Sequence, residues 1–157
     1  MLHIKSPQEI PETRDPKVFL AGSIEMGAAD RWQESVVKKL AQEQVVVLNP
    51  RRDNWDVGWE QRKDNPSFRQ QVEWELHALE QSNYIIMYFD PATKSPISLL
   101  ELGLYARSGK LLVTCPKGFW RKGNVDIVCE MYHVLQFTNL DTLLEYLTSL
   151  IRPGSTS

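Results

Sequence analysis

Two glutamates, Glu101 and Glu75, have the surroundings in this sequence that most favour chemistry. Glu101 is the only charged residue of the apolar segment 97–106 (ISLLELGLYA), which has a helical pattern. Burying an unpaired carboxylate costs on the order of several kcal/mol, so Glu101 either lies on a solvent-facing stripe or has a function. Glu75 lies at the edge of the apolar stripe of an earlier helical pattern. Its position fits a solvated residue and a functional residue equally well. Two carboxylates at one crevice suit cleavage of a glycosidic bond, one as nucleophile and one as proton carrier.

The elements that must position these glutamates alternate between strand-like and helix-like patterns. Five short apolar runs are nearly continuous, as expected of parallel strands covered on both faces: 17–21, 45–48, 84–89, 111–115 and, more weakly, 134–137. The helical patterns are Trp32 with Val36 and Leu40, 68–79 after a Ser67–Gln70 capping box, 97–107, and 140–151. This alternation predicts one α/β domain with a doubly wound, five-stranded parallel sheet in the flavodoxin-like order 2-1-3-4-5. We expect that domain to span residues 17–152, between a loose N-terminal extension (1–16) and a polar tail (153–157).

The predicted strand order places a ligand crevice beyond the carboxyl ends of the first and third strands. Gly22 and Ser23 follow the first strand, and Asp90 follows the third. The turn at 21–27 (AGSIEMG) lacks the Lys and Ser/Thr of a P-loop and is not a dinucleotide fingerprint. It is either an ordinary strand–helix turn or one that offers N–H groups and a hydroxyl to a polar ligand.

Two further loops stand out by their composition. The segment 49–66 is long for a connection between a strand and a helix, and such loops are usually functional or disordered. Its tryptophans, Trp55 and Trp59, either stack on a flat ligand or pack back onto the domain as a lid. The basic, aromatic segment 117–122 (KGFWRK) is too short to indicate nucleic-acid binding and is interpreted as a solvated loop.

Composition and charge exclude several classes of function. Among 157 residues, 18 are basic and 20 acidic, giving a net charge of −2 that attracts neither nucleic acid nor anionic lipid. No apolar run approaches the roughly 18 residues of a membrane span, and the N-terminus lacks a signal-peptide pattern. Cys115 and Cys129 form no disulfide framework, and His3, His77 and His133 have no metal-ligand spacing. We expect a cytoplasmic protein that acts on small molecules without a metal or cofactor.

Three segments, taken with their order and spacing, resemble the nucleoside 2-deoxyribosyltransferase superfamily, including its 2'-deoxynucleoside 5'-phosphate N-hydrolase branch. They are 18–24 (VFLAGSI), 75–87 (ELHALEQSNYIIM) and 100–106 (LELGLYA) followed by Gly109-Lys110. The resemblance covers about residues 17–130.

The resemblance implies that Glu101 is a nucleophile that attacks C1' of the deoxyribose and forms a covalent glycosyl-enzyme. A second base, or water, would then attack from the opposite face, so that two inversions retain the configuration. It also implies that Glu75, where the family usually has Asp, handles the proton at the base. Gly22 and Ser23 would line the sugar side of the pocket, and the loop with Asn49 and Asp53 would reach the base.

The sequence departs from the family pattern at Phe19 and Ser95 as well as at Glu75. Phe19 replaces a Tyr whose hydroxyl steadies the nucleophile in many relatives. Ser95 stands where transferases often have Asp and phosphate-handling hydrolases often have Ser, and Asp90 could supply the missing carboxylate.

The resemblance further implies that Asn124 and Asp126 belong to a segment with which a neighbouring subunit reaches the 5' end of the sugar. There, Asp126 would accept a hydrogen bond from a free 5'-hydroxyl and repel a 5'-phosphate. This charge argument favours a nucleoside substrate, while Ser95 favours a nucleotide. A homo-oligomer is expected in either case, because the neighbour completes the site.

The favoured interpretation is a 2'-deoxyribosyltransferase that exchanges bases between deoxynucleosides, with free nucleobases as the other reactant. An N-glycoside hydrolase of deoxynucleosides or their 5'-monophosphates, using the same nucleophile, is the first alternative. A non-catalytic nucleotide-sensing module is a second. A flavodoxin-like electron carrier is disfavoured, because the turn after the first strand lacks the Ser/Thr-rich pattern of such sites.

Overall fold

A computed structural model describes residues 1–24, 31–52 and 59–153. Three groups of residues named above lie outside the described residues: Asp53 and Trp55 of the long loop, residues 25–27 of the 21–27 turn, and all but the first residue of the polar tail. The described strands are β1 (Leu2–Lys5), β2 (Lys17–Gly22), β3 (Val46–Asn49), β4 (Tyr84–Tyr88), β5 (Leu111–Thr114) and β6 (Leu135–Gln136). The described helices are α1 (Trp32–Lys39), α2 (Pro66–Gln81), α3 (Pro96–Tyr105), α4 (Lys122–Met131) and α5 (Leu140–Ile151).

The described strands form one parallel sheet in the order β1-β3-β2-β4-β5-β6. Without β1, this is the flavodoxin-like order that the sequence predicts, so the α/β class and the strand order are confirmed. The count of five strands was wrong by one, because β1 pairs with β3 in parallel from Leu2 opposite Val46 to Lys5 opposite Asn49. An edge strand with Leu2 50% exposed has no continuous apolar run to reveal it.

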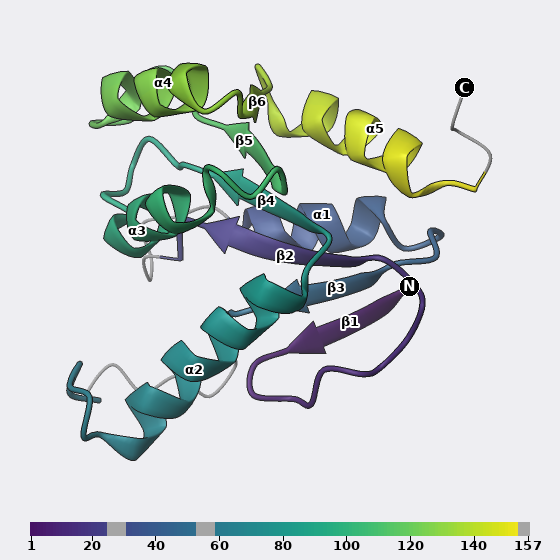
Figure 1. The fold of residues 1–157 in the computed structure, drawn as a ribbon, viewed down its shortest axis with the longest axis vertical. Helices are drawn as coiled ribbons and strands as arrows, with labels where there is room; N and C mark the ends of the chain where they lie inside the picture. Colours follow the sequence, from purple (N-terminus) through teal and green to yellow (C-terminus); the bar gives the residue numbers. More distant parts are fainter. Residues whose placement is uncertain (25–30, 53–58, 154–157) are drawn as a thin grey trace.

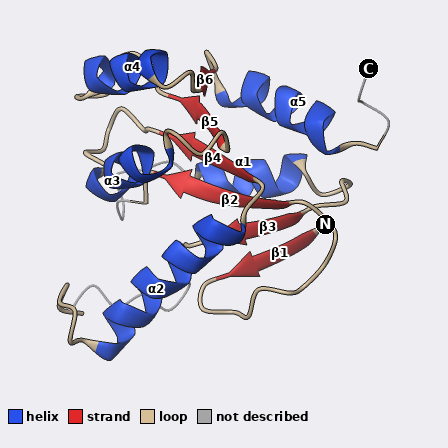
Figure 2. Cartoon of the chain, in the orientation of Figure 1, coloured by secondary structure: helices blue, strands red, loops and turns tan. Residues whose placement is uncertain are grey.

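Helices cover both faces of the sheet (Figures 1 and 2). Figure 1 shows α2 and α3 in front of the strands and α1 behind them. Alternate residues of a strand enter different cores: Phe19 and Ala21 of β2 pack with α2, α3 and α4, while Val18 and Leu20 pack with α1 and α5. None of the described helices has the length and apolar character needed to cross a bilayer.

The structure differs from the sequence interpretation at the start of α2 and in the presence of α4. Helix α2 is capped by Asn65, whose Oδ1 accepts hydrogen bonds from the N–H groups of Ser67 (3.1 Å) and Phe68 (3.3 Å), so Ser67 is not the cap. Helix α4 was not anticipated, because only Val125 and Cys129 of it are buried and the periodicity is short. A parallel connection from β5 to β6 nevertheless requires such a crossover.

The close approach of the carboxyl ends of β2 and β4 depends on the absence of a side chain at Gly22. Its φ is +146°, and a Cβ there would lie 2.4 Å from the Tyr88 carbonyl oxygen and 2.8 Å from Cζ2 of Trp32. Only glycine allows both this conformation and this approach. Gly22 therefore fixes the path of the chain as it leaves β2 for the candidate crevice.

We expect Gly22→Ala to lower the free energy of unfolding by several kcal/mol, because the backbone of β4 has to move to accept the new methyl group. Gly123→Ala in α4 is the matched control, since a Cβ there meets nothing within 4 Å. Urea denaturation of both variants checks this. A Gly22→Ala midpoint equal to that of the control would contradict the close approach.

Candidate active site

The Glu101 side chain faces the interior of the protein from α3. It is 7% exposed and shares the buried face of the helix with Ser98, Leu102 and Tyr105. The alternative of a solvent-facing Glu101 is therefore wrong. Helix α3 presents its carboxylate inward and large apolar side chains outward, the reverse of a helix on the surface of a soluble monomer.

Glu75 is the second carboxylate of the site, and it lies partly buried on α2, on the same face of the sheet as α3 (Figure 1). Burial raises the pKa of Glu75, and a hydrogen bond from Gln71 partly offsets this effect, so that the pKa is about 7. Burial and the negative charge of Glu75 raise the pKa of Glu101 to about 8. The two groups therefore interact, and the pair binds a proton near neutral pH.

The surroundings of Glu101 supply little to stabilise its charge. Within the described part of the chain, no hydrogen bond ends on the Glu101 carboxyl group. Phe19 is fully buried in the core on the same face of the sheet and brings no hydroxyl. A hydrogen bond connects the two helices that carry the carboxylates: the Tyr105 hydroxyl of α3 donates to Glu80 of α2 at 2.6 Å.

Three buried hydroxyls hold the carboxyl ends of β2 and β4 to the start of α3. Ser23 Oγ lies 2.6 Å from Ser95 Oγ and 2.9 Å from Thr93 Oγ1, which are themselves 2.6 Å apart. The Asp90 N–H donates to Ser23 Oγ at 2.8 Å. Ser95, the residue before α3, has a φ of +47° and does not cap the helix through its side chain, because its hydroxyl belongs to the hydroxyl cluster.

The structure thus brings together Gly22, Ser23, Asp90 and Ser95, all of which the sequence indicated. Sequence reasoning missed Thr93, whose only signal was its place in the polar run between Asp90 and α3. Asn49 ends β3, and its side-chain hydrogen bonds are made outside the hydroxyl cluster. Its Oδ1 accepts from the Arg51 N–H at 3.0 Å, and its Nδ2 lies 3.2 Å from Nε2 of His3.

Most of the elements described above belong to a segment that matches a known protein family. The family model described as nucleoside 2-deoxyribosyltransferase like matches residues 15–119. The chain belongs to this family. A search of curated proteins finds no match.

The family match runs from just before β2 to just after β5 and contains both carboxylates and the hydroxyl cluster. It leaves out β1 and α4, and with them Asn124 and Asp126. On α4, Asn124 is exposed, and Asp126 is paired with Lys122 at 3.1 Å. No contact between described residues joins either side chain to Glu101 or Glu75.

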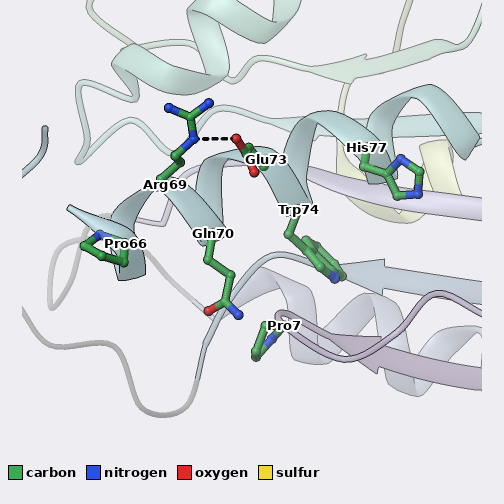
Figure 3. A pocket seen from close by; sticks show the side chains of 7 residues that line it. All are labelled: Pro7, Pro66, Arg69, Gln70, Glu73, Trp74 and His77. Atoms are coloured by element: carbon green, nitrogen blue, oxygen red, sulfur yellow. Dashed lines mark hydrogen bonds and ion pairs between the residues drawn. The ribbon is translucent and has the colours of Figure 1, made fainter. Parts of the chain in front are cut away.

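Two hollows in the surface lie elsewhere. One of about 710 Å³ borders the outer side of α2. Figure 3 shows Gln70 and Trp74 extending on the side of Pro7, while Arg69 and Glu73 pair on the other side of the helix. The second, of about 360 Å³, lies among the ends of α3, α4 and α5. Neither is lined by Glu101 or Glu75, and the described ranges contain no cluster of His, Cys, Asp or Glu that could hold a metal ion.

The raised pKa of Glu101 predicts a pH-dependent change in stability. Above the ordinary carboxyl pKa, the folded state keeps a proton that the unfolded state has lost, so stability falls as pH rises from about 4.5 to about 8. We expect Glu101→Gln to remove this loss. Its free energy of unfolding should exceed that of the unsubstituted protein by a margin that grows with pH, on the order of a few kcal/mol at pH 9.

Urea denaturation at pH 5, 7 and 9 measures this margin. Glu73→Gln is the control, because Glu73 is an exposed carboxylate on α2 that pairs with Arg69. Its margin should stay small at all three pH values. A Glu101→Gln margin that does not grow with pH would show that the carboxylate is not destabilised by its surroundings.

Proposed function

We propose that the protein is a nucleoside 2'-deoxyribosyltransferase that exchanges the base of 2'-deoxynucleosides through a covalent glycosyl-enzyme on Glu101. The observation that carries this proposal is the buried carboxylate of Glu101, which is coupled to a second carboxylate in a chain of this family. A nucleophile and a proton carrier are the two groups that retaining cleavage of a glycosidic bond requires.

In the first step, a carboxylate oxygen of Glu101 attacks C1' of the deoxyribose. The C1'–N bond breaks, its electron pair leaves with the base, and Glu75 gives its proton to the base. In the second step, a nitrogen of an incoming base attacks C1' from the opposite face. The bond to Glu101 breaks, and Glu75 takes up the proton of the incoming base. The configuration at C1' is retained, and the enzyme returns to its starting state.

This cycle needs one proton on the pair of carboxylates. With two protons, Glu101 is neutral and a poor nucleophile. With none, Glu75 cannot protonate the leaving base. With pKa values of about 7 for Glu75 and about 8 for Glu101, the pair carries one proton near neutral pH. Because the pKa of Glu101 is the higher, this proton lies more often on Glu101, and the cycle starts from the share of the pair in which the proton is on Glu75 and Glu101 is ionised.

The remaining candidate residues bind the substrate in this proposal. Gly22 and Ser23 border the sugar, with Asp90 and Ser95 held beside them, and Asn49 and Asp53 serve the base. Asn124 and Asp126 of a second subunit reach the 5' end of the sugar. Because Lys122 is paired with Asp126, the repulsion of a 5'-phosphate is weaker than an unpaired carboxylate would give. Deoxynucleosides remain the proposed substrates, and their monophosphates belong in the assay.

A second copy of the chain is the proposed partner of α3. Ile97, Leu100 and Leu104 are 56–59% exposed at helical spacing, and the only charged residue of α3 is the buried Glu101. Ile127 and Met131 of α4 add two further exposed apolar side chains. A helix that is apolar on all sides is normally covered. Covering this face with a second subunit is consistent with a site to which α4 of a neighbour contributes.

The activity is tested by incubating the protein with single deoxynucleosides or deoxynucleoside monophosphates, with and without a second free base. We expect a new deoxynucleoside to form only when the second base is present. Glu101→Gln should reduce base release to the level of the buffer blank, and Glu75→Gln should slow it roughly 10²- to 10⁴-fold. The control Glu73→Gln should keep full activity.

The kcat/KM should fall below pH 7 and above pH 8, where the pair of carboxyl groups of Glu75 and Glu101 gains or loses a proton.

Other outcomes of the same assay contradict the proposal in different ways. Base and free deoxyribose released at a rate that an added base does not change would make the protein a hydrolase. Reaction of the monophosphates alone would refute the preference for nucleosides. Full activity of Glu101→Gln would remove its assignment as nucleophile.

Light scattering after size-exclusion chromatography tests the proposed oligomer. We expect a homo-oligomer at micromolar concentration and a monomer for Leu100→Asp, because a charge at the centre of the exposed α3 stripe opposes its burial. Leu150→Asp is the matched control, since Leu150 is an exposed leucine on α5, which packs on the opposite face of the sheet. A monomeric unsubstituted protein would contradict the second subunit.

A further inference from the structure

The side-chain amide of Gln71 makes three hydrogen bonds beside the candidate active site. Its Nε2 donates to Oε1 of Glu75 at 2.9 Å and to the Pro50 carbonyl oxygen at 2.8 Å. Its Oε1 accepts from the Ser6 hydroxyl at 2.6 Å. Gln71 and Ser6 are both at least nine-tenths buried, so these bonds do not compete with bulk water.

The Pro50 carbonyl oxygen decides which way the Gln71 amide faces. A carbonyl oxygen can only accept a hydrogen bond, so the amide nitrogen has to lie toward Pro50. The reversed amide would set its oxygen against the acceptors of both Pro50 and Glu75. The Ser6 hydroxyl completes the arrangement by donating to the amide oxygen on the other side.

This orientation determines which oxygen of Glu75 is able to carry a proton. Both hydrogens of the Gln71 amide are used, one on Pro50 and one on Oε1 of Glu75. A proton on Oε1 would meet an N–H group instead of an acceptor. The proton therefore belongs on Oε2.

We propose that Gln71 is a positioning residue, oriented by Pro50 and Ser6, that reserves Oε2 of Glu75 for the transferred proton. The inference rests on the proposed role of Glu75 as the proton carrier. Ser6 directly follows β1, and its N–H group bonds to the Asn49 carbonyl at 3.0 Å. The N-terminal strand, which lies outside the family match, thus takes part in the site of this chain through Gln71.

The test is a titration of the Glu75 side-chain carboxyl carbon by NMR in the isotope-labelled protein. Glu101 is the neighbouring ionisable group whose charge couples to Glu75, so the titration is recorded in a Glu101→Gln background. In that background, Gln71→Leu should shift the Glu75 midpoint to higher pH, because the amide that favours the ionised form is gone. Ser6→Ala, which removes only one hydroxyl, should shift it by a smaller amount in the same direction.

Gln70→Leu is the matched control, because Gln70 is an exposed neighbour on α2 that bonds to Arg52. It should leave the Glu75 midpoint in place. In the protein that keeps Glu101, Gln71→Leu should lower kcat for base release at least tenfold with little change in KM, since substrate contacts remain.

An unchanged or lowered Glu75 midpoint in folded Gln71→Leu would overturn the inference, and the same result in Ser6→Ala would overturn it if Gln71→Leu does not fold. The titration needs no turnover. A protein that releases no base would therefore refute the proposed function and leave the role of the amide to be decided by the midpoint alone.

Discussion

The site depends on one costly arrangement, a carboxylate turned into the protein from an otherwise apolar helix. Glu101 is buried, and the negative charge of Glu75 acts on it, so its own charge is opposed by both burial and repulsion. A group held in this way is poorly stabilised while it is ionised and gains by forming a bond to an electron-poor carbon. In the proposed mechanism, the cost to folding and the reactivity of Glu101 toward a sugar have the same physical source.

The rest of the fold keeps this arrangement in place. Because β2 and β4 are parallel, their carboxyl ends lie at the same edge of the sheet, and the absence of a side chain at Gly22 lets the two ends approach closely. The hydroxyl cluster of Ser23, Thr93 and Ser95 then sets the start of α3, which fixes where Glu101 enters the core. On the other helix, Gln71 holds Glu75 through bonds that reach back to the end of β1.

Much of this was predictable from the sequence, because long periodic patterns and buried strands dominate the fold. The isolated charge in ISLLELGLYA pointed to Glu101, and burial agrees with that interpretation. What escaped prediction depends on few side chains or on distant partners. Strand β1 is short and exposed, α4 buries two residues in its ten, and the amide of Gln71 gains its meaning only from Pro50 and Ser6, far away in the sequence.

The central claim is that Glu101 becomes covalently bonded to the sugar. Mixing the protein with a deoxynucleoside, quenching in acid within the first turnovers and mapping the peptides by mass spectrometry tests it most directly. The account predicts a deoxyribosyl ester on the peptide that contains Glu101, lost when a second base is added before the quench and absent from Glu101→Gln. Turnover with an adduct on another residue, or with an inverted configuration at C1', would contradict it.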